Sequence, residues 1–469
     1  MSRRRLTSAF AALMLSACAT TRGRPVSAPG ELAYRISRPA TPRAIDLEIR
    51  RVREGPAAFT FSSPGAVGRV RAELADGKQV ELSVPSSGEL DVPNDWAVLR
   101  YRLLLDDVHR SFGSADLSWG LANETDLLVP GAAWLLRPRV AVPGLTATIS
   151  SDGPGLLLPW EPRADGRWEV SAQDLIDSGF HALGGRRCFL TVGQGKLEVA
   201  LLGAVHPLGD EAICEWVRGS AAELLQVRTG FPVARVTIAI VPVLSNEASP
   251  FGRILPSTPR SLGFLIGVEA RGEDFAKDWV ALHELLHLVH PPFAPKELWL
   301  TEGIATLYTE VARARSKRHS PEKAWEELLE GFDQAAAEAS GMRMEEVIRD
   351  GGTRLRATAW AGVLFLLSLD LELRLRTGGR RSLDDVLDVL SSTQPMTLAQ
   401  FGAHVDAVSG PKIFDDVLHA HRIKPAFFPL RALLDQLGVR RADGKVSFEA
   451  APRAGERDAL MRAKVRAEP

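Results

Sequence analysis

The stretch from residue 279 to 303 constrains this chain more than any other part of the sequence. It contains a His-Glu-x-x-His motif formed by His283, Glu284 and His287, and Glu302 follows further along. On a helix the two histidines lie one turn apart on the same face, so their imidazoles can converge on one metal ion beside Glu284. The stretch therefore predicts a metal site built around a helix.

Zinc chemistry explains this choice of residue types. A catalytic zinc ion is held by three protein ligands, imidazole nitrogens or carboxylate oxygens at roughly 2.0–2.2 Å, and keeps a fourth position for water. The pKa of that water falls to about 7, so a carboxylate beside it can take the proton and later return it to a leaving amine. We therefore expect zinc as the cofactor, His283 and His287 as ligands, and Glu284 as the general base and acid of a hydrolase.

The third ligand depends on how the chain returns after the motif. The motif helix is expected to begin near Glu273, two consecutive prolines end it, and a second helix is expected from about 296 to 315. If that second helix folds back antiparallel, it brings Glu302 over the two histidines. His290 and Glu297 remain competing ligands, and a core helix without metal remains the alternative for the whole motif.

Composition limits the class of protein and one class of partner. The chain has 469 residues, of which 45% are hydrophobic and 25% are charged, enough to bury the cores of two or three domains. Its 57 basic and 58 acidic residues give a formal net charge of -1. Such a balance offers no electrostatic attraction to nucleic acid, which is excluded as a partner. The sequence does not define an oligomeric state.

The N-terminus has the features of an export signal. Three arginines are followed by an apolar run from Leu6 to Leu15 that is too short to span a bilayer. The segment ends in Leu-Ser-Ala-Cys, which resembles the bacterial lipoprotein box and would make Cys18 the lipidated first residue; a secretory signal with an incidental cysteine is the alternative. We expect a signal peptide at 1–17, a flexible tether at 18–44 and a lipid anchor in the bacterial cell envelope.

Two further cysteines, Cys188 and Cys214, remain after the predicted signal. In an exported, oxidising location they are consistent with one disulfide. Two separate buried thiols are the alternative.

The rest of the chain divides by its hydrophobic pattern. Residues 45–175 contain many short, partly alternating apolar runs between turn residues, which predicts an all-β, sandwich-like domain. A catalytic domain is expected at 176–436 and a charged, mobile C-terminal tail at 437–469. Within the catalytic domain, a strand at 263–269 directly precedes the motif helix. We expect it to be an edge strand that aligns an extended peptide.

The motif region resembles a known family. HELLH followed by LWLTEGIATLY looks like the gluzincin metallopeptidases, in particular the glycyl aminopeptidase family, and 366–390 is similar to that family's helix, Thr-Gly-Gly turn and following helix. The resemblance covers roughly 180–430. It implies an α+β fold in which an all-β domain precedes a thermolysin-like zinc peptidase domain, with a mixed sheet and a mostly helical C-terminal half. It also implies a peptide or protein substrate and Glu302 as the third zinc ligand.

The sequence departs from this family in two places. The family's tyrosines before the downstream helix, one of which resembles a transition-state stabiliser, are replaced here by a segment that ends in Trp360. The loop 244–261 lacks a Gly-Gly-x-Glu segment for a substrate amine, so aminopeptidase specificity is not supported. The candidate oxyanion stabilisers are Tyr308, Arg354, Arg356 and His404. We expect an exported, lipid-anchored zinc metallopeptidase; the alternative is a non-catalytic envelope lipoprotein that retains the fold to bind a partner.

Overall fold

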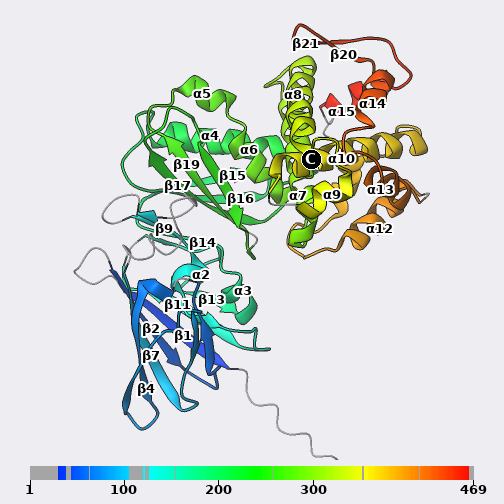
Figure 1. The fold of residues 1–469 in the computed structure, drawn as a ribbon. Coiled ribbons are helices and arrows are strands. Elements are labelled where there is room, and N and C mark those ends of the chain that lie inside the picture. Colours follow the sequence, from blue (N-terminus) through cyan, green and yellow to red (C-terminus); the bar gives the residue numbers. More distant parts are fainter. Residues whose placement is uncertain are drawn as a thin grey trace, which may run out of the picture.

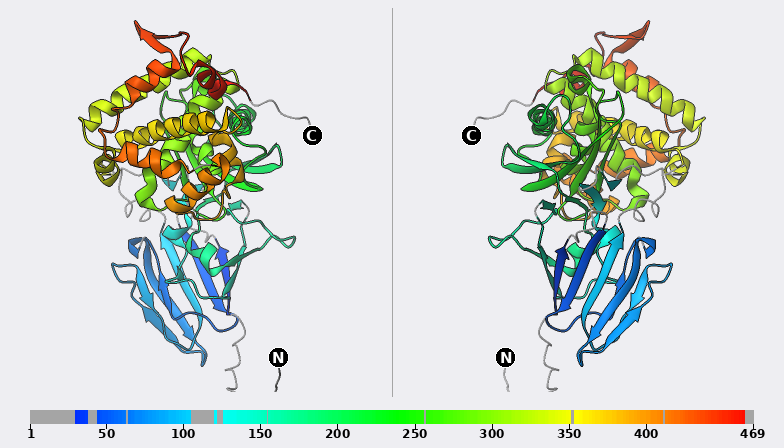
Figure 2. Two further views of the ribbon diagram at one scale, coloured as in Figure 1. Left: turned by 90° about the vertical axis from the view of Figure 1, so that its right-hand side faces the viewer. Right: turned by 90° about the vertical axis from the view of Figure 1, so that its left-hand side faces the viewer.

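The protein combines an N-terminal β domain with an α+β domain whose second half is helical (Figure 1). The two side views in Figure 2 show the same separation of the N-terminal sheets from the helices. This arrangement confirms the predicted α+β class. The computed structural model describes residues 30–37, 44–62, 64–104, 120–121, 126–153, 155–255, 257–350, 353–410 and 412–463. The predicted signal peptide and Cys18 lie outside these ranges, and within them no helix is long and apolar enough to cross a membrane.

A seven-stranded sheet forms the body of the N-terminal domain. Burial alternates along its strands, as expected when one face of a sheet covers a core. All neighbouring pairs are antiparallel except β1 with β11. In spatial order the strands are β13 (Trp168–Ser171), β11 (Thr146–Ser151), β1 (Glu31–Ser37), β2 (Ala44–Arg51), β7 (Trp96–Leu104), β4 (Val67–Leu74) and β5 (Gln79–Leu82).

A second, three-stranded sheet packs against the first. Phe59 of the small sheet meets Trp96 of β7 edge to face, with ring centroids 5.6 Å apart, and both side chains are fully buried. The two sheets therefore share one core, as in a sandwich. The strands of the second sheet are β10 (Arg137–Pro138), β3 (Ala58–Thr60) and β6 (Glu89–Asp91).

The predicted tether is too long, because its last part is a strand. β1 lies between β2 and β11 in the large sheet. Its alternating side chains Leu32, Tyr34 and Ile36 are almost completely buried, and the hydroxyl of Tyr34 donates to the carbonyl of Leu136 at 2.8 Å. The expectation of a flexible tether through residue 44 is therefore wrong for residues 31–37.

A small sheet and two short helices connect the domains. The amide of Phe180 donates to Oγ of Ser261 in the α+β domain at 2.6 Å, and apolar side chains from both sides form a shared cluster. The strands are β12 (Leu156–Leu157), β14 (Phe180–Leu183), β9 (Leu127–Pro130) and β8 (Gly120–Leu121), and the helices are α2 (Gly131–Trp134) and α3 (Ala172–Ile176).

A five-stranded sheet begins the α+β domain. Its three central strands β16, β17 and β19 are parallel, and antiparallel strands β15 and β18 close the two edges. Helix α4 (Asp210–Glu223) is joined to β15 by a disulfide between Cys188 and Cys214, the pairing expected from the sequence. In order the strands are β15 (Arg186–Val192), β16 (Gly195–Leu201), β17 (Arg235–Val243), β19 (Ser261–Gly267) and β18 (Phe251–Leu255).

The helical half lies beside this sheet (Figure 1). Its long helices α7 and α10 pack against each other at two glycines: a Cβ on Gly303 would lie 2.8 Å from the carbonyl carbon of Gly362. The helices are α7 (Leu298–Arg315), α8 (Pro321–Ala339), α9 (Met344–Asp350), α10 (Leu355–Thr377), α11 (Leu383–Val389), α12 (Leu398–Ser409), α13 (Phe414–Arg422) and α14 (Leu430–Leu437).

The expected C-terminal tail is also ordered over most of its length. It forms the hairpin of β20 (Val439–Ala442) and β21 (Lys445–Phe448), followed by α15 (Ala454–Met461). Leu460 is buried, and its carbonyl accepts a hydrogen bond from Nε of Arg315 in α7 at 3.0 Å. The prediction of a mobile tail is wrong for these elements, because apolar residues within a charged sequence dock onto the helical half.

Candidate metal centre

The motif helix is shorter than the sequence predicts. Instead of one helix from about Glu273, the chain forms α5 (Gly272–Lys277), a break, and α6 (Val280–Leu286). Asp278 leaves the helical conformation, with φ -57° and ψ 137°, and its carboxylate accepts the amide of Ala281 at 3.1 Å. A 3₁₀ turn, η3 (His287–Val289), completes the motif. α6 thus begins only one turn before the first histidine.

The structure brings together the three residues predicted as metal ligands. Nε2 of His283 lies 3.4 Å from Oε2 of Glu302, and Nε2 of His287 lies 3.8 Å from Oε1 of the same carboxylate. The three ligand atoms lie within 4.8 Å of one another, and no other such group occurs in the described part of the chain. Two atoms bound tetrahedrally at about 2.1 Å from zinc lie roughly 3.4 Å apart, so the donor set and its spacing fit a zinc ion.

Burial and the neighbouring charges set the protonation of these groups. Burial lowers the pKa of His287 well below its ordinary value. For Glu302, burial raises the pKa, but the two histidines outweigh it and the net shift is downward. For His283, burial lowers the pKa, but the hydrogen bond to Glu302 and the charge of Glu284 outweigh it and the net shift is upward. An ionised carboxylate therefore faces the imidazoles, which favours a cation between them.

Glu284 lies between the histidines and strand β18. Its Oε2 accepts the amide N–H of Ile254 at 2.9 Å, and a Cβ on Gly252 would lie 2.9 Å from its Cγ. Burial is the main reason that the pKa of Glu284 is raised. The close approach of β18 and α6 fixes the orientation of this carboxylate.

Strand β18 corrects the predicted role of the segment 263–269. The strand found there, β19, pairs with β17 on one side and β18 on the other, so it is an interior strand. β18 is the edge strand, and it comes from the 244–261 segment that the sequence places in a loop. An edge strand does adjoin the motif helix, but that strand is β18 and not the strand predicted at 263–269.

A cleft of about 810 Å³ opens beside the metal group. It is lined by β18, α6, α7, α8 and the beginning of α10. Trp279 and Leu355 contribute large apolar surfaces to the lining and are about half exposed. His283, Glu284 and Glu302 all face this cleft, so a substrate can reach the site.

Of the four candidate oxyanion stabilisers, the structure places Arg356 alone in the lining of this cleft. Tyr308 is buried, and its hydroxyl donates to Asp384 at 2.7 Å. Arg354 forms an ion pair with Asp350, and His404 lies on α12. Neither residue lines the cleft. The chain has three tyrosines in total, and the other two are buried in the β domain, so no tyrosine hydroxyl lines the cleft.

The two competing ligands have other partners. Nε2 of His290 lies 3.1 Å from Nδ1 of His287, and its Nδ1 lies 2.7 Å from the carbonyl oxygen of Pro291. Glu297 accepts the indole N–H of Trp299 at 2.9 Å. Neither residue belongs to the metal group.

Sequence reasoning did not identify Arg260 as part of this site. It is buried, and burial lowers its pKa to about 10. Its guanidinium donates to the carbonyl of His287 and, at 3.2 Å, to that of His290. No motif marks this arginine in the sequence, since its role depends on the residue before β19 and the η3 turn meeting in space.

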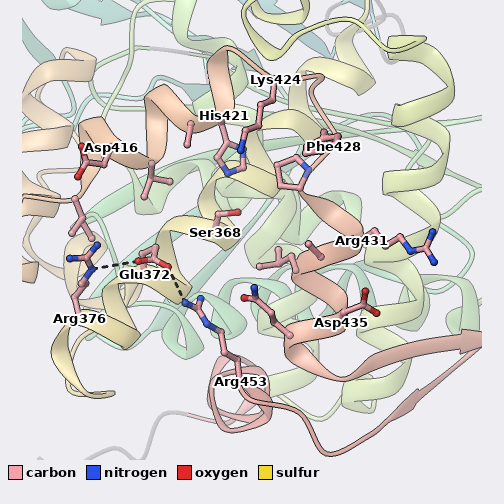
Figure 3. A pocket seen from close by; sticks show the side chains of 17 residues that line it. Ser368, Glu372, Arg376, Asp416, His421, Lys424, Phe428, Arg431, Asp435 and Arg453 are labelled. Carbon is pink, nitrogen blue, oxygen red and sulfur yellow. Dashed lines mark hydrogen bonds and ion pairs between the residues drawn. The ribbon is translucent and has the colours of Figure 1, made fainter.

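A second cavity of about 720 Å³ lies among α10, α13 and α14 (Figure 3). Glu372 bridges Arg376 and Arg453 at one side of it, and Phe428 stands exposed at another. Its lining contains none of the metal-group residues.

Comparison with known proteins adds evidence on the fold. No protein-family model matches the sequence, and no curated protein matches it. A solved aminopeptidase N family protein from Idiomarina loihiensis is similar, with a TM-score of 0.65 and 15% identity, over 87% of this chain and 78% of that one.

Two further structures are more distant. Leukotriene A4 hydrolase from Saccharomyces cerevisiae has a TM-score of 0.49 at 14% identity, over 85% of this chain and 68% of its own. An M1 zinc metallopeptidase from Deinococcus radiodurans has a TM-score of 0.42 at 15% identity, over 83% of this chain and 92% of its own.

The first likeness shows an α+β fold shared with the aminopeptidase N family protein, including the β domain and the helical half. At this identity it shows the fold alone, and the chemistry must be argued from the residues of the site.

Proposed function

We propose that this protein is a zinc-dependent metallopeptidase of the gluzincin type that hydrolyses peptide bonds. The observation that carries the proposal is the convergence of His283, His287 and Glu302 within 4.8 Å, beside Glu284 and open to a cleft of about 810 Å³. Bound zinc would supply a Lewis acid and lower the pKa of its water to about 7.

Each residue of the site then has a defined task. The two histidines and Glu302 would hold the metal, and the ionised carboxylate would offset part of its charge. Glu284 takes the proton of the attacking water and returns it to the leaving amine. The hydrogen bond from the amide of Ile254 holds its carboxylate against β18.

We propose β18 as the strand that aligns the substrate. Its amide at Ile254 points to Glu284 rather than to β19, so the outer side of β18 faces the site. An extended peptide can pair with such an edge and place its scissile bond next to the metal. Arg356 is the candidate oxyanion stabiliser that lines the cleft, and we propose that it interacts with negative charge that develops on the substrate.

We further propose export and lipid anchoring at Cys18, with the mature protein in the bacterial cell envelope. The basic and apolar N-terminus supports this location, and so does the Cys188–Cys214 disulfide, because disulfides persist in oxidising compartments. A Cys18→Ser variant is expected to leave the membrane fraction; a variant that stays there would contradict lipid attachment at this residue.

The second candidate is a non-catalytic envelope protein that keeps the fold to bind a partner. The observation that favours it is the absence of any tyrosine hydroxyl from the cleft lining.

Metal analysis combined with a peptide-library digest separates the two candidates. The wild-type protein is expected to bind one zinc ion and to cleave peptides, while Glu284→Gln retains zinc and loses cleavage by a factor of at least about 100. Glu273→Gln, an exposed substitution on α5, is the matched control. Zinc binding without cleavage that depends on Glu284 would contradict the peptidase and favour the binding protein.

A further inference from the structure

His290 follows the metal-binding motif and is turned toward one of its ligands. Because it precedes Pro291, its backbone is extended, with φ -125° and ψ 158°. Its ring meets that of His287 edge to face at 5.4 Å and stacks on Phe293 at 5.7 Å with an interplanar angle of 23°. Only 1% of the residue is exposed, so the packing fixes the ring in one orientation.

We propose that His290 is a positioning residue, which holds His287 in the tautomer that leaves Nε2 of His287 free to bind the metal. The inference rests on the proposed zinc centre and assigns a role to a residue that is not itself a ligand.

The hydrogen bonds give the direction of this effect. The carbonyl of Pro291 can only accept, so Nδ1 of His290, 2.7 Å away, must carry a proton. A neutral imidazole that donates at Nδ1 accepts at Nε2. Nδ1 of His287, 3.1 Å from that Nε2, must then donate. The remaining lone pair of His287 lies on Nε2, the atom that faces Glu302.

The opposite arrangement would require a charged His290. A doubly protonated ring would donate at both nitrogens, and His287 would then carry its proton on Nε2 and lose its metal-binding lone pair. The buried guanidinium of Arg260 donates to the carbonyls of both residues and opposes a second positive charge nearby. The same two bonds satisfy the carbonyls of the first residue of η3 and of the residue that follows the turn, and they hold its backbone in place.

This support is unequal between the two histidine ligands. Nδ1 of His283 is buried and has no hydrogen-bond partner in the described structure. His287 alone of the pair therefore has its Nδ1 hydrogen-bonded to another side chain. Supporting bonds of this kind typically change metal affinity by about 10–100-fold.

Two substitutions separate hydrogen bonding from packing. His290→Phe keeps an aromatic ring next to Phe293 but removes the acceptor, whereas His290→Gln keeps an oxygen that can reach the position of Nε2. In competition with a chelator, we expect zinc binding to weaken by about 10–100-fold in His290→Phe and by less than about 5-fold in His290→Gln. Equal zinc affinity of wild type and His290→Phe would overturn the proposal, and so would equal weakening in the two variants.

A second measurement does not require zinc. Nitrogen-15 spectra of the metal-free, histidine-labelled protein identify which ring nitrogen of His287 carries the proton, and we expect Nδ1. A proton on Nε2 would overturn the inference even if the protein binds zinc. Conversely, a wild-type protein with the expected tautomer but no affinity for zinc would contradict the proposed function and leave the positioning bond intact.

Discussion

Gly303 of α7 and Gly362 of α10 lie in direct backbone contact: a Cβ on Gly303 would be 2.8 Å from the carbonyl carbon of Gly362 and 2.9 Å from its Cα. Real Cβ atoms are essentially never so close to another backbone. Because Glu302 directly precedes Gly303, this contact holds the backbone of α7 in place next to the third metal ligand. The absence of two side chains thus lets α7, which carries the third metal ligand, pack directly against α10.

A methyl group at this contact is expected to disturb both stability and metal binding. In Gly362→Ala the new Cβ would collide with the carbonyl oxygen of Trp299 and force α7 away from α10. We expect a loss of stability of about 1–3 kcal/mol, measured by urea unfolding, together with weaker zinc binding. The control is Gly219→Ala on α4, where a Cβ meets nothing within 4 Å and helix propensity predicts a gain of about 0.5–1 kcal/mol. Equal stability of Gly362→Ala and wild type would contradict the tight packing.

The identity of the third ligand can be tested by a pair of glutamate substitutions. Glu302→Ala removes the carboxylate that faces both histidines, whereas Glu297→Ala removes one that binds Trp299. Chelator competition should show zinc binding weakened by more than about 100-fold in Glu302→Ala. Loss of a ligand should weaken binding more than loss of a hydrogen bond that only supports a ligand. Glu297→Ala should stay within a few-fold of wild type. Retention of zinc by Glu302→Ala would instead indicate another ligand, such as His290.

His181 is expected to make the protein sensitive to acid. It is completely buried, with Nδ1 accepting the indole N–H of Trp134 and Nε2 lying 2.8 Å from the carbonyl of Ser178, and burial lowers its pKa to about 3. Between pH 6.5 and about 3 the unfolded chain binds a proton here that the folded protein does not. The contribution of this residue to the free energy of unfolding is therefore fully present above pH 6.5. It falls by about 1.4 kcal/mol for each pH unit below that value.

The measurement compares urea unfolding of wild type and His181→Gln at pH 7 and pH 5. Glutamine offers both a donor group and an acceptor group but does not titrate in this range. The wild type should lose more stability than the variant on acidification. The same pH dependence in both proteins would exclude His181 as the source.

The metal group could be predicted from the sequence because it depends on local periodicity. The spacing of His283 and His287 is a property of one helix, and Glu302 needs only a return of the chain through a short turn. The same periodicity could also have excluded Tyr308. It lies six residues, or about 600° of helix rotation, beyond Glu302, so it points to another side of α7. Thr306, four residues beyond Glu302, does line the cleft.

The remaining features depend on contacts between distant parts of the chain. β18 has only five residues in a segment rich in Ser, Pro and Gly, and nothing in that segment shows that it pairs with β19 on one side alone. The same holds for β1. The alternation of its apolar and polar residues is visible in the sequence, but its place in the sheet is determined by its pairing with β2 and β11. Edge and interior positions are fixed by such pairings, which periodicity does not encode.

Gly252 offers a test of β18 that is separate from metal binding. A Cβ at this position would lie 2.8 Å from Phe264, 2.9 Å from Glu284 and 2.9 Å from Val280, so it would push the edge strand away from the motif helix. The hydrogen bond from Ile254 to Glu284 would lengthen, and the pairing edge would move relative to the metal group. Because the three ligands lie elsewhere, Gly252→Ala should bind zinc like wild type while its peptidase kcat/KM falls by about 10–100-fold. Gly219→Ala again serves as the control for a glycine substitution that meets open space. Unchanged peptide cleavage by Gly252→Ala would show that β18 does not align the substrate, and loss of zinc would show that β18 instead supports the metal group.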